Sequence, residues 1–396
     1  MSLAAAKRLL EQARTQGARV GSVTVESADG MGLGLVATRK LRAGQPVLRL
    51  PESLWRPLSA DEAYVQLKDR HPALLDDLMD FAQAQDIPMQ SRLLLVGSVC
   101  FVLHLLREIA APSSEATALH LNAMPKSVST PLFWDATQMA RLQASPLVSK
   151  ISERRQLIDS IFTHVVEPHV GAMPEANVTP SNFSFAWSLL LSRAISDLRS
   201  RMPFTLPPVL DMMNHVSAAN ASQISSFLPH SALGSEPTAT VSPMSADVPQ
   251  GKCQHWFDHL SSSFVVAPLQ DVPEGSQLFI SYGDLSNADL LRLYGFTMEA
   301  NAFDGVDFLV STPTGPARHR CRIDGSLEYP QDGPRVDPLT LERSLSRCLE
   351  AYESSARDDL SFLKTQVRAS QDVIDATRVR LGEKQSLERA LAALQS

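Results

Sequence analysis

Three short segments of the sequence combine residue types that can bind a ligand or move a proton. Gly32 and Gly34 flank Leu33, and a backbone without Cβ atoms can approach a small ligand closely. Residues 211–215 read Asp-Met-Met-Asn-His, a set that can ligate a metal, cap a turn or bind a polar ligand. Tyr282 precedes a glycine, and such a tyrosine, taken singly, is more typical of a strand end with a satisfied hydroxyl than of catalysis.

The glycine pair is open to further interpretations. It resembles part of a dinucleotide-binding fingerprint, which requires a helix directly after the glycines. Residues 38–44 instead predict a turn into another strand, so no helix N-terminus would hold a pyrophosphate. A hairpin whose glycines serve only close packing, and a glycine turn against a small ligand, both stay open.

A second cluster of metal-ligating residue types lies further along the chain. His255 and His259 would share one face of a helix, close to Cys253, and could hold zinc. Only one cysteine is present there, and the cluster borders a polar segment, so we predict no metal site. The four cysteines of the chain lie far apart without a C-x-x-C pair, which argues against a disulfide framework and favours a reducing compartment.

The elements that must position these segments alternate between strand and helix. Strand-like runs occur at residues 20–25, 33–36, 47–50, 206–213, 263–267 and 277–282. Apolar residues at helical spacing fill residues 60–200 and the last sixty residues. Ser286, Asp289 and Gly295 predict the start and the stop of a helix. The first ten residues predict an amphipathic helix, with an organelle transit sequence as the alternative.

The bulk composition limits the class of protein. A chain of 396 residues with 44% hydrophobic content predicts a large core in two domains or in one domain with an insertion. The net charge of -7 shows no excess of basic residues that would favour binding to nucleic acid or to an anionic membrane. The most apolar stretch, 93–106, contains His104 and is too short to span a bilayer, which predicts a buried helix. Residues 216–251 contain no Lys or Arg and predict a disordered surface loop.

The order of the motifs resembles the SET-domain protein methyltransferases, in the branch of the Rubisco large-subunit methyltransferase and the actin-histidine methyltransferase. The series runs from the G-x-G turn through Ser192-Arg193 and the Asp-x-x-Asn-His segment to Tyr282 and the Tyr-Gly-Phe of 294–296. Further matches lie at Leu50-Pro51, Met124-Pro125, 130–134, Trp187, 301–304, 352–359 and 380–384. The resemblance therefore covers nearly the whole chain.

This resemblance implies a mixed α+β fold. It consists of a SET-type β-fold of short strands interrupted by a helical insertion, plus an all-helical C-terminal domain. The implied segments are the N-terminal part of the SET domain (1–70), the helical insertion (71–205), the C-terminal part of the SET domain (206–300) and a short substrate-binding domain (301–396).

The resemblance also implies a chemistry, the transfer of a methyl group from S-adenosylmethionine to a lysine of a non-histone protein. Tyr282 would be the catalytic residue, orienting the amine and favouring the positive charge of the transition state. The implied cofactor-binding residues are Met31, Gly32, Leu33, Arg193, Asp211, Asn214, His215, Tyr282 and Phe296. The implied substrate-binding residues are Ile195, Leu210 and Tyr294. We expect a cytoplasmic monomer with a protein substrate and no nucleic-acid or membrane partner; nucleus and plastid stay open.

The chain departs from the family pattern at several positions. Relatives usually carry an acid at Met31 and a basic residue at Leu285, and often an aromatic pair near 116–120. Histidine-methylating members carry Asn at the position of Ile195 and Trp at that of Leu210. Apolar residues there favour an alkylamine over an imidazole, which needs hydrogen bonds to select its tautomer. A histidine methyltransferase and a catalytically weak protein-binding scaffold are the alternatives.

Overall fold

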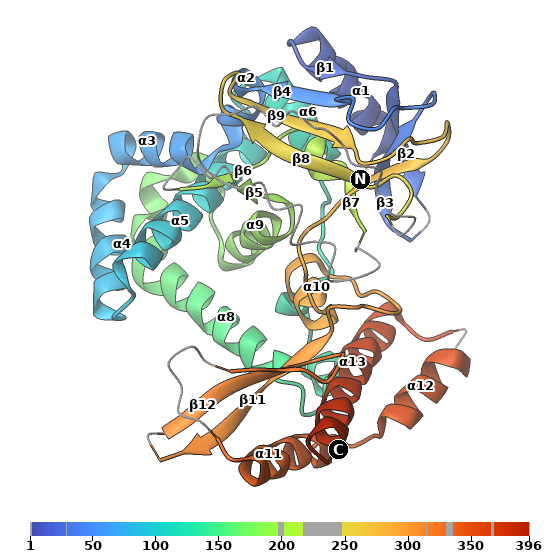
Figure 1. The fold of residues 1–396 in the computed structure, drawn as a ribbon. Helices are drawn as coiled ribbons and strands as arrows, with labels where there is room; N and C mark the ends of the chain where they lie inside the picture. Colours follow the sequence, from blue (N-terminus) through green and yellow to red (C-terminus); the bar gives the residue numbers. More distant parts are fainter. Residues whose placement is uncertain are drawn as a thin grey trace. The chain divides into compact units, whose positions relative to one another are not determined.

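The computed structural model describes residues 2–28, 30–196, 202–216, 248–313, 315–329, 336–365 and 368–395 (Figure 1). Almost all of the segment expected to be a disordered loop lies outside the described residues. Contacts divide the chain into two compact units. The first unit comprises Met1–Val128 and Leu157–Tyr282, and the second comprises Ser129–Gln156 and Gly283–Ser396. The four-segment division expected from the sequence stays a prediction.

The first unit contains two small four-stranded sheets. One has the order β1 (Arg19–Val20), β4 (Leu48–Pro51), β9 (Ser263–Pro268) and β8 (Cys253–Asp258). The other has the order β2 (Val23–Ala28), β3 (Gly32–Ala37), β10 (Gln277–Ile280) and β7 (Asn214–His215). Strands from the start of the chain therefore share sheets with strands after residue 250, which confirms the expected β-fold of short strands interrupted by helices.

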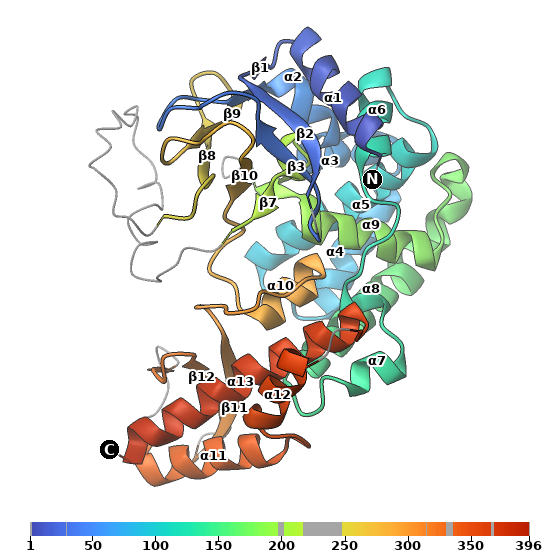
Figure 2. The ribbon, with the colours of Figure 1, turned by 90° about the vertical axis from the view of Figure 1, so that its right-hand side faces the viewer.

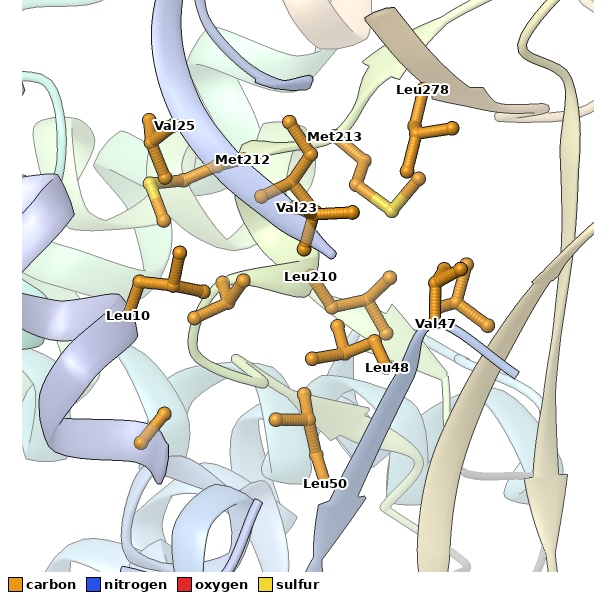
Figure 3. Packing of buried hydrophobic residues seen from close by; sticks show 14 of the residues in the cluster. Leu10, Val23, Val25, Val47, Leu48, Leu50, Leu210, Met212, Met213 and Leu278 are labelled. Atoms are coloured by element: carbon orange, nitrogen blue, oxygen red, sulfur yellow. The ribbon is translucent and has the colours of Figure 1, made fainter. Parts of the chain in front are cut away.

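The core of the first unit lies between these sheets and the opening helix α1 (Leu3–Thr15). Ser2 caps this helix, and its residues Ala6, Leu9, Leu10 and Ala13 recur at helical spacing and are buried. Figure 3 shows Leu10 in one cluster with the alternating residues of β2 and β4 and with Leu210, Met212 and Met213. The backbone after residue 209 is therefore fixed by the same apolar cluster that holds the sheets together.

Helices fill the rest of the first unit. They are α2 (Glu52–Trp55), η1 (Arg56–Leu58), α3 (Ala60–Arg70), α4 (Pro72–Ala84), α5 (Met89–Ala110), α6 (Glu115–Ala123) and α9 (Pro180–Arg193), with irregular turns η3 (Phe162–Val166), η4 (Glu167–Ala172) and η5 (Pro174–Ala176). Among the described residues, α5 alone has the length and apolar composition that would allow it to cross a membrane, and most of its apolar stretch is buried in this unit. The helix is longer than the sequence suggested, because its polar ends continue the helical spacing, but it is the buried helix expected there.

Two expectations for this unit are wrong. Residues 206–213 do not form a strand: after β6 (Phe204–Thr205), which pairs with β5 (Ile195–Ser196), the chain makes a 3₁₀ turn, η6 (Leu210–Met212). Pro207 and Pro208 cannot donate ladder hydrogen bonds, and Val209 has a φ of 71°, so a strand is broken there. His255 lies in β8 and His259 follows it, so the two do not share a helical face.

The second unit combines a small sheet with helices. Its helices are η2 (Pro131–Phe133), α7 (Ala136–Ala140), α10 (Asn287–Tyr294), α11 (Pro338–Glu350), α12 (Ala356–Thr365) and α13 (Gln371–Gln395), and α8 (Leu147–Ile161) begins in it. Its sheet has the order β11 (Gly305–Thr312), β12 (Gly315–Arg322) and β13 (Leu327–Glu328). The C-terminal region is therefore helical only after the hairpin. The expectation of an all-helical domain missed this hairpin, in which Val306, Phe308 and Val310 alternate inward against α11 and α13.

Helix α13 carries buried charged residues that pair within the second unit. Lys384 lies 2.7 Å from Asp359, and Arg380 donates to the same carboxylate at 2.8 Å. Glu383 accepts hydrogen bonds from Tyr352 at 2.9 Å and from Ser145 at 2.8 Å. Burial raises the pKa of Glu383 to about 7, so this carboxyl is partly protonated near neutral pH.

Candidate functional site

One turn of the first unit joins most of the residues singled out in the sequence. Thr205 donates its hydroxyl to the Trp55 carbonyl at 3.1 Å, which anchors the chain directly before the two prolines. At the end of α9, Arg193 donates from Nη1 to the Asp211 carbonyl at 2.8 Å. The Tyr282 hydroxyl donates to the Met213 carbonyl at 2.8 Å. Two carbonyls of the same turn therefore fix the Arg193 guanidinium and the Tyr282 phenol.

Strand pairing explains why Tyr282 reaches this turn. Strands β7 and β10 run parallel, with Asn214 opposite Phe279 and His215 opposite Ile280. Tyr282 follows β10 by two residues, and its backbone N–H donates to Nδ1 of His215 at 3.1 Å. The two rings lie 5.1 Å apart between centroids. Segments separated by the long polar stretch are therefore adjacent because their strands share a sheet.

His215 is neutral at physiological pH. Burial lowers its pKa to about 4, and the nearby Lys252 charge adds to the effect, while a backbone hydrogen bond at Ile280 opposes it. Nδ1 accepts from the Tyr282 amide, which is consistent with an unprotonated ring nitrogen at that position. The His215 ring can therefore accept a hydrogen bond and orient its partner without adding a positive charge to the site.

The glycine strand completes one side of the site. Asn214 donates from Nδ2 to the Leu33 carbonyl at 3.1 Å, which ties β7 to β3. A Cβ on Gly34 would lie 3.1 Å from that same Nδ2 and would overlap the end of the Gln277 side chain, so a larger residue would displace both side chains. Gly32 has a φ of 80°, and Met31 beside it is half-exposed. The backbone at Gly32 is thus open to approach, whereas Gly34 serves close packing.

The structure adds one residue that the sequence did not single out. His120 on α6 is buried, and its Nε2 lies 3.4 Å from Oδ2 of Asp211. Within the described part of the chain, neither this Nε2 nor Oδ1 of Asp211 has a hydrogen-bond partner. A lone histidine in a helix carries no pattern that links it to a turn so far along the chain, so no sequence signal pointed to it.

The remaining predicted residues fall in different surroundings. Ile195 in β5 pairs with Thr205 in β6 and packs, partly buried, against the apolar core of the first unit. Leu210 is fully buried within that core. Tyr294 and Phe296 belong to the second unit, where their ring centroids lie 6.3 Å apart. Burial raises the pKa of Tyr294, which keeps its phenol protonated. The substrate-binding role of Ile195, Leu210 and Tyr294 stays a prediction, as does the adenine-binding role of Phe296.

The donor set has the chemistry to bind a polar ligand that carries a carboxylate. An arginine fork, open glycine backbone, an amide side chain and a neutral imidazole converge here, and guanidinium binds carboxylate well. Across the described ranges no group of three or more His, Cys, Asp or Glu side chains could hold a metal ion. The orphan Oδ1 of Asp211 leaves a further acceptor for a ligand.

No protein-family model matches the chain, but curated relatives do. The actin-histidine N-methyltransferase of Gallus gallus is 20% identical over 97% of this chain and 67% of its own length. The chloroplastic large-subunit N-methyltransferase of ribulose-1,5-bisphosphate carboxylase/oxygenase from Nicotiana tabacum is 26% identical over 69% of this chain. The chain spans about two thirds of the first relative and, at 47%, about half of the second.

Solved structures show the same fold. The SET domain of LSMT bound to lysine and AdoHcy covers all of this chain with a TM-score of 0.69 at 15% identity. Rubisco LSMT bound to AdoMet covers 99% of it with a TM-score of 0.68 at 15% identity. At this level of identity the likeness establishes the fold.

Proposed function

This chain has the SET-domain fold of the Rubisco large-subunit methyltransferase branch and is related in sequence to that branch, and we propose that it transfers a methyl group from S-adenosylmethionine to a lysine of another protein. The observation that carries the proposal is the convergence of Arg193, the 211–215 turn and Tyr282. These residues lie far apart in sequence and meet through hydrogen bonds in the fold.

Three features would hold the methyl donor. Arg193 has guanidinium N–H groups beyond the Nη1 bond to Asp211, and these suit the donor's carboxylate. The backbone at Gly32, which is exposed and has a φ of 80°, offers polar groups without a side chain, next to Leu33, whose carbonyl accepts from Asn214. Asn214 and the neutral His215 would meet the adenine and amino-acid ends of the donor. A cationic sulfonium fits this set because the histidine carries no charge.

Tyr282 is the residue that would act at the reacting nitrogen. In the displacement the sulfur–methyl bond breaks as the nitrogen–methyl bond forms, and the nitrogen must first be neutral. The Tyr282 proton is committed to the Met213 carbonyl, so the phenol oxygen presents lone pairs that accept an N–H of the amine. That contact orients the nitrogen and stabilises the positive charge that develops on it. The surplus proton leaves to water.

Apolar residues favour lysine as the acceptor. By the resemblance, Ile195 and Leu210 correspond to positions at which histidine-methylating members carry Asn and Trp, and neither side chain here can hydrogen-bond to an imidazole. An apolar channel also lowers the pKa of a lysine from about 10.4, which makes the nucleophilic form more abundant. Histidine methylation is the second candidate, since an actin-histidine relative aligns over 97% of this chain.

Two measurements test the proposal. Calorimetry on the purified chain is expected to show binding of S-adenosylmethionine and of S-adenosylhomocysteine, and no binding refutes the proposal. Mass spectrometry then compares methylated peptides from cells that express the wild type, Tyr282→Phe, or Tyr329→Phe at an exposed tyrosine. A methyl-lysine present with the wild type and Tyr329→Phe, and lost with Tyr282→Phe, supports it. A methyl-histidine with this behaviour selects the second candidate.

Full rescue by Tyr282→Phe would instead indicate a protein-binding scaffold. We further propose that the protein acts as a monomer in the cytoplasm. Light scattering of the purified chain and a fluorescent fusion at its C-terminus test these two points.

A further inference from the structure

A cleft of about 350 Å³ lies in the first unit, and none of its lining residues makes the hydrogen bonds described for Arg193, Asn214 and Tyr282. Helices α1, α2 and α6, which gather near the top of Figure 2, supply most of its walls together with η1. Its lining includes Leu9, Gln12, Leu54, Leu58, Ala116 and His120, and none of its lining residues is Lys, Arg, Asp or Glu.

The lining defines the chemistry of an occupant. The volume is within the range of pockets that take small organic molecules, about 300–1,000 Å³. Leu9, Leu54 and Leu58 provide apolar surface, while Gln12 and His120 provide hydrogen-bond donors and acceptors. A charged molecule would lose hydration in the cleft without meeting a lining residue of opposite charge. An uncharged polar molecule does not need such a residue, because hydrogen bonds replace its hydration.

One wall residue connects the cleft to the site. His120 is only 4% exposed, and its Nε2 has no hydrogen-bond partner among the described residues. A buried imidazole nitrogen without a hydrogen bond is unfavourable, and a ligand that enters the cleft and turns the ring can supply one. The same ring lies 3.4 Å from Asp211, whose carbonyl accepts from Arg193 at 2.8 Å. A shift of the His120 ring therefore acts on the turn that fixes Arg193.

We propose that this cleft binds a small uncharged molecule that carries an amide or hydroxyl group, and that His120 couples its occupancy to the turn of Asp211. The cleft is distinct from the residues assigned to the methyl donor, apart from this contact. The binding part stands without the proposed function, and the coupling part rests on it.

Three molecules of one shape test the binding. Benzamide is uncharged, benzoate is an anion and benzamidine is a cation, and each is titrated against the full chain by ligand-observed NMR. Benzamide is expected to bind at least about tenfold more tightly than either ion, because no lining residue offsets a charge. Equal binding of an ion, or no binding of benzamide, overturns the proposal.

Cavity-filling variants locate the binding. Ala116→Leu on α6 and Ser53→Phe on α2 fill the cleft from two walls, and each is expected to abolish benzamide binding. Ala118→Leu on the same helix does not face the cleft and is expected to leave binding unchanged. Retained binding in both filling variants refutes this location.

Calorimetry tests the coupling. Saturating benzamide is expected to change the Kd of S-adenosylhomocysteine by about fivefold in the wild type. It is expected to have no effect on that Kd in His120→Phe. An equal effect in both proteins overturns the role of His120. If S-adenosylhomocysteine does not bind at all while benzamide does, the proposed function fails and the cleft stands.

Discussion

The neutral state of His215 makes the stability of the first unit depend on pH. Burial is the main cause of its pKa of about 4, against an ordinary value of 6.5. In the unfolded chain the imidazole takes up a proton below pH 6.5, and in the folded chain it does so only near pH 4. The contribution of the neutral His215 ring to the free energy of unfolding is therefore complete above pH 6.5 and is lost as the pH falls towards 4.

The size of this effect follows from the two pKa values. Between pH 7.5 and 5, protonation of the unfolded chain at this one site removes about 2 kcal/mol from the free energy of unfolding, and by pH 4 about 3 kcal/mol. The substitution His215→Gln keeps a hydrogen-bond acceptor for the Tyr282 amide but cannot titrate. The variant is therefore expected to lose about 2 kcal/mol less than the wild type over the same pH range.

Urea unfolding at pH 7.5 and 5 measures the difference. Tryptophan fluorescence suits the assay, because Trp55, Trp187 and Trp256 lie in the first unit. His164→Gln at an exposed histidine is the matched control and is expected to show the pH dependence of the wild type. If His215→Gln and the wild type lose the same free energy, the imidazole is not held neutral by burial and the reasoning is refuted. An NMR titration that places the His215 pKa near 6.5 would do the same.

The remaining predictions concern the site and the second unit. Tyr282→Phe is expected to lower the rate of methyl transfer about 100-fold in single-turnover assays while calorimetry shows S-adenosylhomocysteine bound with little change, since only the hydroxyl is lost. Asn214→Ala leaves the Leu33 carbonyl without its donor and is expected to weaken S-adenosylhomocysteine about tenfold by calorimetry; unchanged binding would contradict the assignment. Gly34→Ala is expected to lower the urea midpoint, because its Cβ crowds Asn214 at 3.1 Å. In the wild type, the second unit is expected to lose stability as the pH rises through about 7, because buried Glu383 ionises there. The Glu383→Gln variant is expected to lose less stability over the same range. Hydrogen exchange of α13 measures the difference.

Local signals in the sequence predicted the local elements correctly. Ser286 caps α10 by accepting from the Asp289 amide at 3.2 Å, and Gly295 ends that helix with a φ of 78°. Val23 and Val25 alternate inward in β2, as their spacing predicted. Such signals depend on neighbours along the chain, which a single sequence displays in full.

Signals that depend on distant partners were missed or misassigned. Residues 206–213 are apolar because they enter the core, and apolar content alone does not distinguish a buried turn from a strand. The hairpin of β11 and β12 was overlooked beside the stronger helical spacing that follows it. His120 belongs to the site only because the fold brings it close to Asp211, and that proximity is not visible in the sequence. The site residues themselves came from the order of motifs, and their individual roles are still predictions.

The turn at 209–213 explains how one small site can be held rigid by an apolar core. Val209 has a φ of 71°, a conformation that a β-branched residue adopts only when its surroundings enforce it. Its side chain is fully buried, as is that of Leu210, so packing supplies the enforcement. The carbonyls that accept from Arg193 and Tyr282 belong to Asp211 and Met213, which follow in the same turn. Core packing therefore holds the turn whose carbonyls direct Arg193 and Tyr282, and we expect a site built in this way to need little reorganisation when a methyl donor binds.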